Sequence, residues 1–323
     1  MAKLVSIIIP FHRETEAQLM VVLSSINNQI GIDFDQVEVI LVNDGGQEID
    51  TTHFLPLFTH LQIRYHRYST AKGPGFARGV GTAMAQGRYV MYMDADDQFQ
   101  FVGALLEFFN VIRGHGDHEV IIAAYLEETY HNGEYRYFRH ENNDWKAAYA
   151  KWFNQDYLKR IGLTWREDLH VFEDTYFVGI ACELAQDIYH LNSVVYTWQY
   201  QASSTVRVNG GQSFYRQLDQ WARSNRYYLT MIQRYRPARL NAVYLHYIAD
   251  LYLRLQAYPP LDPAAFAHEH QQLMQTFAPL WALLQAQVPA EIKRLSTTKP
   301  AFAKVSMTGI AAFMRHQAQL AQP

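Results

Sequence analysis

The 323-residue chain carries a formal charge of −3 at pH 7, with 49% hydrophobic and 18% charged residues. This composition supplies a full core, and it excludes a disordered chain and a protein that binds nucleic acid through its net charge. The single cysteine excludes an internal disulfide framework and is typical of a reducing compartment. The sequence predicts no signal peptide and no membrane-spanning helix, which needs about 20 apolar residues. We therefore expect a cytoplasmic protein.

Short apolar runs alternate with helical patterns over the first hundred residues. Nearly continuous apolar strands that alternate with helices predict an α/β fold, in which a mostly parallel sheet has helices on both faces. Pro10 is expected to end the first strand, and Gly87 to follow the second helix. Strands are expected at 4–9, 37–42, 63–68 and 89–93, and helices at 14–28 and 77–86.

The pattern becomes purely helical after residue 210. Before that point, the sequence predicts a strand at 120–126, a hairpin turn at Asn132–Gly133 into a strand at 135–138, helices at 155–161 and 173–184, and a strand at 194–200. After it, prolines separate helices expected at 213–235, 240–256 and 264–287. We therefore expect a domain over residues 1–209 and a helical region over 210–323.

The last segment, residues 301–320, has an amphipathic pattern. It predicts either contact with a membrane surface or packing against the helical region or a second subunit, and packing is favoured. The helical region as a whole is expected to serve acceptor binding, self-association or peripheral membrane contact.

Three carboxylates follow the strand expected at 89–93. Asp94, Asp96 and Asp97 repel one another, and a hard divalent cation such as Mg²⁺ or Mn²⁺ relieves that repulsion. Side chains alternate along an extended chain, so Asp94 and Asp96 are expected on one side and Asp97 on the other. The alternative interpretation is that these residues cap a helix starting near Phe99.

Polar residues follow three of the predicted strands. Residues 11–14, Asp44 and residues 94–97 all lie at carboxyl ends, which meet at one edge of a parallel sheet. The sequence therefore predicts a single crevice that gathers these segments.

Four motifs occur in the order seen in family 2 glycosyltransferases of the GT-A fold. They are SIIIPFHRE, EVILVNDGG, GPGFARGVGTAMAQGRYVMYMDADD and REDLHVFEDTYF. The resemblance covers roughly residues 3–207 and implies a Rossmann-like GT-A domain. It also implies metal-dependent, inverting transfer from a nucleotide sugar, expected to be UDP-linked. The implied acceptor is a hydroxyl of a glycan, a teichoic acid or a lipid-linked molecule, which allows a location at the inner face of the membrane.

The resemblance assigns roles to individual residues. Asp96 is the expected metal ligand, and Asp94 holds the ribose or the water shell of the metal. Asp44 is expected to accept a hydrogen bond from the base, although an Asx-turn before Gly45 is the alternative. Further implied contacts to the nucleotide sugar are Pro10, Phe11, His12, Glu14, Lys72, Gly73, Arg78, Ala95 and Arg207.

Three of these residues have a more specific expected role, and two positions differ from the family pattern. Phe11 is expected to face the base, Arg78 to brace the Asp cluster or the diphosphate, and Arg207 to contact phosphate from a closing loop. His12 and Gly79 depart from the residues that the family has at these places.

The expected general base is Asp174, with Glu173 as its positioning neighbour. Both acids also suit the N-terminal dipole of the predicted helix, which is the structural alternative. Glu167 and Asp168 are the nearest competing carboxylates. Two other functions stay open: a nucleotidyltransferase, and an inactive sugar- or partner-binding protein on the same fold.

Overall fold

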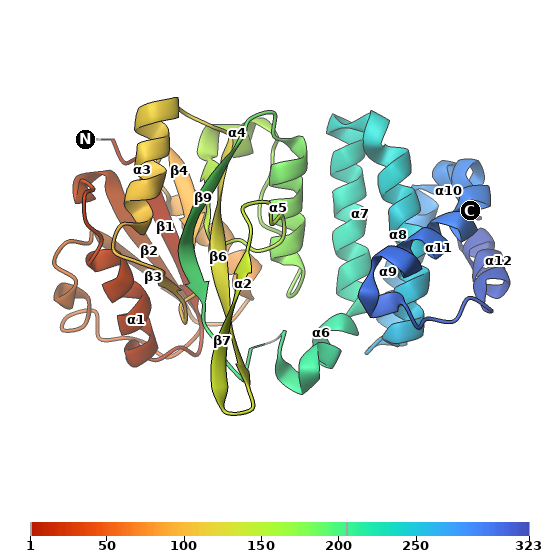
Figure 1. Ribbon diagram of the computed structural model, residues 1–323, viewed down its shortest axis with the longest axis horizontal. Helices are drawn as coiled ribbons and strands as arrows, with labels where there is room; N and C mark the ends of the chain where they lie inside the picture. The colour runs from red at the N-terminus through yellow and green to blue at the C-terminus, as the bar shows by residue number, and fades with distance from the viewer. Residues whose placement is uncertain (1, 205, 323) are drawn as a thin grey trace. The chain divides into compact units, whose positions relative to one another are not determined.

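The computed structural model describes residues 2–204 and 206–322, and the chain forms two compact units. The first unit ends at Tyr200 and the second begins at Gln201, nine residues before the change in sequence pattern. Figure 1 shows an α/β unit followed by an all-helical one, as predicted.

Four strands make the parallel half of the sheet. β1 (Val5–Phe11), β2 (Val37–Asp44), β3 (Ile63–Tyr68) and β4 (Tyr89–Tyr92) lie in the order β3-β2-β1-β4. All residues of β4 and nearly all of β1 and β2 are buried, as expected for strands that are covered on both faces.

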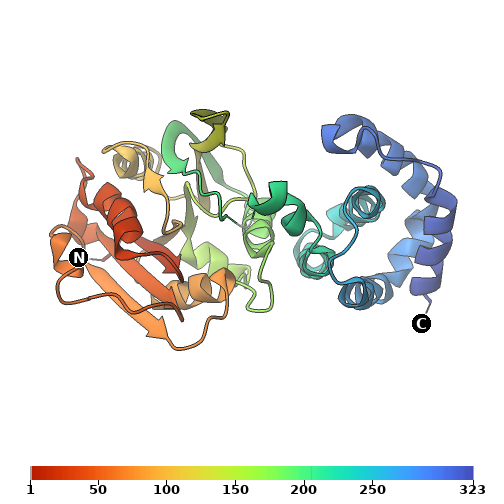
Figure 2. The ribbon, with the colours of Figure 1, turned by 90° about the horizontal axis from the view of Figure 1, so that it is seen from below.

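Helices cover the two faces of this half-sheet (Figure 2). Ile7 and Val39 pack in one core with α1 (Glu16–Asn27) and α3 (Ala104–His115). Ile8 points to the other face, against α2 (Pro74–Met84). The alternation of side chains along each strand thus supplies both cores.

The rest of the sheet continues from β4 in the order β8-β6-β9-β5, and β7 pairs with β6. β9 runs parallel to β6, whereas β8 is antiparallel to both of its neighbours. The predicted α/β fold with a mostly parallel sheet is confirmed, with these antiparallel strands added. The bounds are Gln98–Phe99 for β5, Val120–His131 for β6, Glu134–His140 for β7, Lys151–Asn154 for β8 and Ile188–Trp198 for β9.

Pro10 does not end the first strand, so that prediction is wrong. β1 continues past it, and Pro10 pairs with Val42 of β2. The backbone of Ile8 faces β4, because its carbonyl accepts from the Met93 N–H, and pairing between β1 and β4 ends at this residue. The nitrogen of Pro10, two residues later, faces the same side, where no ladder bond is lost.

No helix starts near Phe99, so the alternative interpretation of the three carboxylates as helix caps is wrong. Phe99 belongs to β5 and pairs with Tyr196 of β9. The next helix, α3, begins only after Gly103. The carboxylates of residues 94–97 therefore cap no helix, and the capping interpretation is excluded.

Several local predictions are confirmed. Asn132 and Gly133 have φ values of 51° and 84° and join β6 to β7 as the predicted hairpin turn. α4 (Gln155–Arg160) and α5 (Glu173–Leu184) follow as expected. The short strand β8 was not predicted, because it holds the buried Lys151, whose Nζ lies 3.2 Å from Asp144.

The second unit contains seven α-helices among the residues described. The expected helix at 264–287 is divided, because Pro279 lies in the first turn of a new helix and cannot continue the old one. Pro237 and Pro289 likewise lie at helix starts, where proline is favoured. The helices are α6 (Gln212–Tyr215), α7 (Leu218–Tyr235), α8 (Pro237–Ala257), α9 (Pro263–Thr276), α10 (Ala278–Leu284), α11 (Val288–Thr298) and α12 (Ile310–Leu320).

The amphipathic C-terminal segment packs within its own unit. Phe313 of α12 contacts Tyr252 of α8, with 5.3 Å between the ring centroids. Buried Gln317 accepts from Nε2 of His270, and Tyr247 donates to Nδ1 of the same imidazole. The favoured prediction of packing against the helical region is therefore confirmed. Among residues 2–204 and 206–322, no helix has the length and apolarity that a membrane crossing needs.

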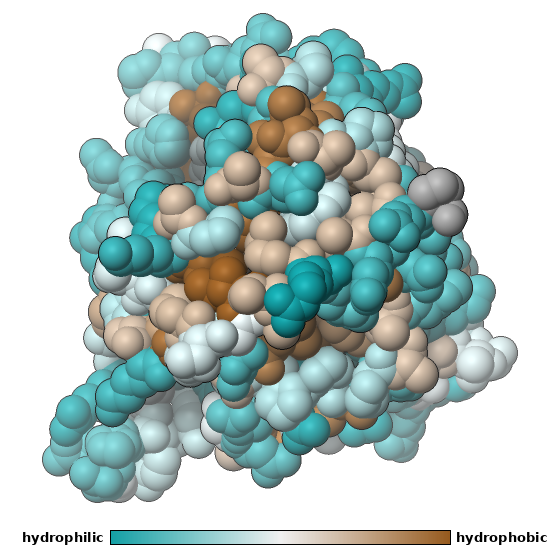
Figure 3. Space-filling view, turned by 90° about the vertical axis from the view of Figure 1, so that its right-hand side faces the viewer, coloured by the Kyte–Doolittle hydropathy of each residue, from teal (hydrophilic) through white to brown (hydrophobic). Residues whose placement is uncertain are grey.

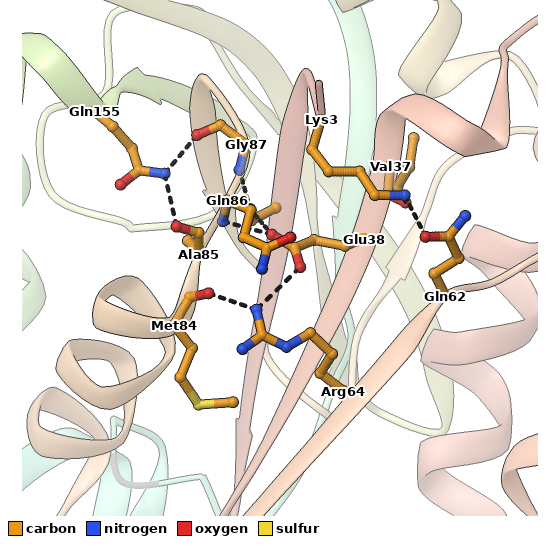
Figure 4. Close-up of polar contacts among 11 residues, drawn as sticks. Lys3, Val37, Glu38, Gln62, Arg64, Met84, Ala85, Gln86, Gly87 and Gln155 are labelled. Carbon is orange, nitrogen blue, oxygen red and sulfur yellow. Dashed lines mark hydrogen bonds and ion pairs between the residues drawn. The ribbon is translucent and has the colours of Figure 1, made fainter. Parts of the chain in front are cut away.

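A buried carboxylate ties the other end of the parallel strands together (Figure 4). Glu38 of β2 accepts from the Ser6 hydroxyl at 2.5 Å and from the Gln86 amide at 2.6 Å, and Arg64 of β3 lies 3.3 Å away. Ser6 in turn accepts from the Gly87 amide. This network fixes the start of β4, and therefore also the position of the carboxylates that follow the other end of the strand.

Gly81 should not tolerate a larger residue. An added Cβ would lie 2.4 Å from Ile8 Cγ2, so Gly81→Ala should lower the free energy of unfolding by about 1–3 kcal/mol through overpacking. Gly114→Ala, in α3 with open space around it, should instead raise it by up to about 1 kcal/mol. Urea denaturation of both variants checks this; equal effects would contradict the close packing of α2 on β1.

Acid should loosen the packing of α12. Burial lowers the pKa of His270 to about 4, from 6.5 in the unfolded chain. As the pH falls, the unfolded chain therefore takes up a proton before the folded chain does. The free energy of unfolding is highest above pH 6.5 and decreases toward pH 4, by about 3 kcal/mol in total. Hydrogen exchange of α9 and α12 between pH 6.5 and 5 should show the loss, and His270→Gln should flatten it. An unchanged pH dependence in that variant would refute the assignment.

Candidate active site

Arg78 of α2 lies at the centre of the site. Its Nη2 donates to Asp94 Oδ1 and its Nη1 to Glu173 Oε1, each at 2.8 Å. The side chain is only 7% exposed, and its guanidinium carbon lies 5.1 Å from the ring centroid of Trp165. One guanidinium thus joins the turn after β4 to the first residue of α5, two segments about eighty residues apart.

Glycines allow α2 to come this close. Gly73 precedes the helix with a φ of 98°, which disfavours other residues, and Pro74 occupies the first turn. A Cβ on Gly75 would lie 2.9 Å from the Arg166 carbonyl oxygen and 3.1 Å from Glu173 Cγ. The KGPG segment therefore seats α2 directly against the loop that leads into α5.

The turn after β4 separates its carboxylates as predicted. Asp97 is fully buried and accepts from the Tyr196 hydroxyl at 2.7 Å and from the Gln199 amide at 2.8 Å. Burial raises the pKa of Asp97 well above its usual value. The Tyr196 hydroxyl also accepts from the Asp94 amide, at 3.1 Å. Asp94 and Asp96 remain half-exposed, and Ala95 between them is buried.

Tyr196 is a residue that sequence reasoning missed. It lies within the apolar end of β9, where a tyrosine usually signals only a core position. Its two hydrogen bonds, to residues about a hundred positions earlier, are visible only in the fold.

The two acids at the start of α5 differ in environment. Glu173 is buried and held by Arg78; burial raises its pKa to about 7, and the guanidinium acts in the opposite direction. Asp174 keeps half-exposed surface, and burial raises its pKa too, again against Arg78. Phe172, just before them, has a φ of +62°, an unfavourable value for an aromatic residue. Such strain is often found next to functional residues.

The competing carboxylates lie outside this group. Glu167 is exposed, and Asp168 lies 3.2 Å from Arg166 in the same loop. Arg78 donates to Glu173 rather than to either of them.

Asp44, at the end of β2, holds the start of α2. Its Oδ1 accepts from the Tyr68 hydroxyl at 2.6 Å and the Lys72 amide at 2.7 Å, and its Oδ2 accepts from the Gly73 amide at 2.8 Å. The side chain that bonds the backbone of the glycines is that of Asn43, whose Oδ1 accepts from the Gly46 amide three residues on. Contact of Asp44 with a base stays a prediction.

The segment after β1 lies beside Asp44. His12 Nδ1 is 2.7 Å from the Asp44 carbonyl oxygen, and the Glu14 carboxylate accepts from the His12 amide at 2.8 Å. Phe11, next to Pro10, is buried against Tyr65, with 6.4 Å between centroids, rather than facing outward as a base-stacking ring would.

Two cations are the remaining residues that the family resemblance assigns to the donor. Lys72 is exposed, with its Nζ 4.2 Å from the centroid of the Phe76 ring. Arg207 belongs to the second unit, where it precedes a short 3-10 helix, Val208–Gly211. Thr205, in the predicted closing loop, lies outside the described residues, and the role of Arg207 stays a prediction.

The carboxylates fit a divalent cation of the Mg²⁺ or Mn²⁺ type. Among the described residues, no group of three or more His, Cys, Asp or Glu side chains is arranged to hold a metal. Asp94 and Asp96 nevertheless offer hard oxygen ligands, and Mg²⁺ is commonly held by one or two carboxylates together with substrate phosphates.

Comparison with family models identifies the chain. The model of Glycosyl transferase family 2 matches residues 6–180, more than half of the sequence. The protein belongs to glycosyl transferase family 2. It is a glycosyltransferase by family. The matched range contains β1 except for its first residue, every strand from β2 to β8, and most of α5.

Solved structures show the same fold. S. aureus TarS 1–349 in complex with UDP-GlcNAc has a TM-score of 0.68 and 16% identity, covering 98% of this chain and 90% of that one. The complex of the same protein with UDP gives a TM-score of 0.65 at the same coverage. The mannosyltransferase PcManGT from Pyrobaculum calidifontis, with GDP-Man and Mn²⁺, gives 0.52 at 16% identity, covering 99% and 87%. A comparison with curated proteins finds no match.

Removal of the Arg78 charge should be strongly destabilising. Arg78→Met leaves Glu173 and Asp94 without their shared cation and should lower the free energy of unfolding by about 3–5 kcal/mol. Arg88→Met, which breaks the exposed pair with Asp117, should cost about 1 kcal/mol or less. Urea denaturation measures both. If Glu173→Gln does not reduce the loss in the Arg78→Met background, the buried pair is not its cause.

Proposed function

We propose that this protein is a metal-dependent, inverting glycosyltransferase that uses a nucleotide-diphosphate sugar. The observation that carries the proposal is the contact of Arg78 with both Asp94 and Glu173. In a family 2 chain, this contact holds the carboxylates of the β4 turn beside the pair that opens α5. The donor phosphates and the acceptor hydroxyl would meet between these two groups of carboxylates.

Each residue has a task in this proposal. Asp174 accepts the proton of the acceptor hydroxyl as the oxygen attacks the anomeric carbon. Its raised pKa, with burial as the main cause, makes it a better base than an ordinary aspartate. Glu173, held by Arg78, positions the start of α5 and contacts no substrate in this scheme. One base and no second carboxylate as nucleophile correspond to inversion at the anomeric carbon.

Asp96, with Asp94, would hold the divalent cation. When bound, Mg²⁺ or Mn²⁺ supplies Lewis-acid neutralisation of the leaving diphosphate. Asp97 and Tyr196 keep the turn rigid so that both other carboxylates face outward. The complex of PcManGT with GDP-Man and Mn²⁺ supports a divalent metal in this fold.

The nucleoside would lie against Pro10, residues 12–14, Asp44 and residues 72–73. They are adjacent through the bonds of Asp44 to the 72–73 amides and of His12 to the Asp44 carbonyl. Uracil is our proposed base because TarS was solved with UDP and UDP-GlcNAc, although PcManGT was solved with GDP-Man. The proposed acceptor is a glycan, teichoic acid or lipid-linked hydroxyl, reached from the cytoplasm, with Arg207 closing on the phosphates.

The contacts of the site favour this function over the two alternatives. A nucleotidyltransferase needs no proton acceptor of the Asp174 kind beside the metal carboxylates. An inactive binding protein would not need a buried arginine to keep two acidic segments in register.

The base and the metal can be tested separately. Asp174→Asn should lower the turnover of a nucleotide sugar by about 10²–10⁴-fold while leaving its binding intact. Asp96→Ala, like EDTA, should abolish turnover and weaken donor binding. Nucleotide release measures the first effect and calorimetry the second.

Matched controls are Glu167→Gln and Asp168→Asn, the two competing carboxylates. Both should retain turnover. If either loses as much as Asp174→Asn, the base is misassigned; full activity with EDTA would remove the metal from the mechanism.

A further inference from the structure

Strand β7 has one edge without a partner strand. Among residues 2–204 and 206–322, β7 pairs only with β6, and the hairpin that they form extends beyond the other strands of the sheet (Figure 1). Its sequence, EYRYFRH, contains no proline or lysine, which commonly protect an edge strand. Its aromatic side chains are exposed instead: 60% for Tyr135, 58% for Tyr137 and 62% for Phe138. An edge of this kind is a template for a further strand.

The turn at Asn132–Gly133 fixes which backbone groups of β7 face outward. A two-residue turn closes on a hydrogen-bonded pair, here His131 with Glu134, and such pairs alternate along an antiparallel ladder. The backbone of Arg136 therefore faces β6, and its carbonyl oxygen also accepts from Thr129 Oγ1 at 3.2 Å. The backbone N–H and C=O groups that point away from β6 are those of Tyr135, Tyr137 and Arg139.

We infer that two copies of the protein associate by antiparallel pairing of their β7 strands, with Tyr137 on the two-fold axis. In this register Tyr137 lies opposite itself in a hydrogen-bonded pair, as its outward backbone groups require. The whole of Glu134–His140 overlaps, and no like charges lie opposite each other. The other pairs, each formed twice, are Tyr135 with Arg139, Arg136 with Phe138, and Glu134 with His140. The inference does not depend on the proposed function.

Other registers are less favourable. Moving the axis by one residue shortens the overlap to residues 134–138 or 136–140. With the axis at Arg136, two arginines also lie opposite each other, which is destabilising. A parallel pairing in register would do the same at both Arg136 and Arg139. The order of residues in β7 therefore favours the antiparallel arrangement centred on Tyr137, and a second copy of this chain as the partner.

The tyrosines of β7 are held in place before any partner binds. The Tyr137 hydroxyl donates to Glu128 Oε1 at 2.8 Å. The ring of Tyr135 lies against that of Tyr130, with 4.9 Å between the centroids. Because these rings are already ordered, their pairing with a second strand costs less side-chain entropy.

The two arginines of β7 have different roles in this pairing. Arg139 donates to Glu141 and to a carbonyl of β9, so it contributes its backbone rather than its charge. Arg136 lies 3.8 Å from Glu134, but these side chains are 63% and 73% exposed, which makes the pair weak. The Arg136 guanidinium is therefore available to lie over the Phe138 ring of the second copy.

The helical unit is less suited to self-association. On the face in Figure 3, strongly hydrophobic residues lie in separate patches among hydrophilic ones. In β7, by contrast, the three exposed aromatic residues lie within residues 135–138. Among the residues described in the helical unit, the exposed large hydrophobic side chains lie on separate segments and are Val208, Tyr215, Leu261 and Leu283.

Sedimentation velocity of the full chain tests the association. The wild-type chain should form a reversible dimer whose population rises with concentration. Phe138→Arg sets two positive charges opposite each other at both symmetric positions and should raise the dissociation constant about tenfold or more. Addition of Arg136→Glu makes these pairs opposite in charge and should restore the dimer. Because residue 138 lies opposite Glu127 of β6, Phe138→Arg leaves the hairpin itself favourably paired.

Disulfide formation tests the register. The Cα atoms of a hydrogen-bonded antiparallel pair lie about 5.5 Å apart, a distance that suits a disulfide, so Tyr137→Cys should give a covalent dimer on mild oxidation. In the matched control, Tyr135→Cys, the two thiols would be four positions apart, or about 13 Å, and no covalent dimer should form. The natural Cys182 is buried.

A monomer at every concentration, a dimer that persists in Phe138→Arg, a failure of Arg136→Glu to restore it, or equal cross-linking of the two cysteine variants would each overturn the inference. Binding of maltoheptaose by a monomeric wild-type chain, with loss of that binding in Phe138→Arg, would assign the exposed rings to a carbohydrate instead.

Discussion

The site depends on one buried guanidinium. Arg78 is nearly inaccessible to water, and a charge in that position needs partners in good geometry. Its partners are Asp94 and Glu173, from the end of β4 and the start of α5. Because Arg78 and Glu173 are both buried, displacement of one would leave the polar group of the other without its partner. The electrostatics therefore hold three segments in register before any substrate arrives.

Hydrogen bonds at both ends of the sheet keep these three segments in place. At the carboxyl end, Tyr196 fixes the turn through Asp97 and the Asp94 amide, while Asp44 fixes the start of α2. At the other end, Glu38 joins β1, β2 and β3 to the entry of β4. Buried polar groups of this kind are stable only when satisfied, so each one specifies a unique arrangement of its neighbours.

The second unit shows a different use of charge. Its buried polar groups include His270 and Gln317, whose hydrogen bond fastens α12 to the bundle. Its ionised groups are mostly basic and on the surface. Its two buried carboxylates, Asp250 and Glu269, are each paired with two cations of the same unit.

Sequence alone determined the α/β class, the helical second part, the hairpin at Asn132–Gly133 and the position of α5, because these follow from local hydrophobic periods and turn residues. It also brought the carboxylates to one edge, since parallel strands share that edge. Only the tertiary structure decided that β1 passes through Pro10, that Phe99 is in a strand, and that Tyr196 supports the turn after β4. Those outcomes depend on which neighbour faces a given backbone or side chain, and such pairings between distant segments leave no period in the sequence.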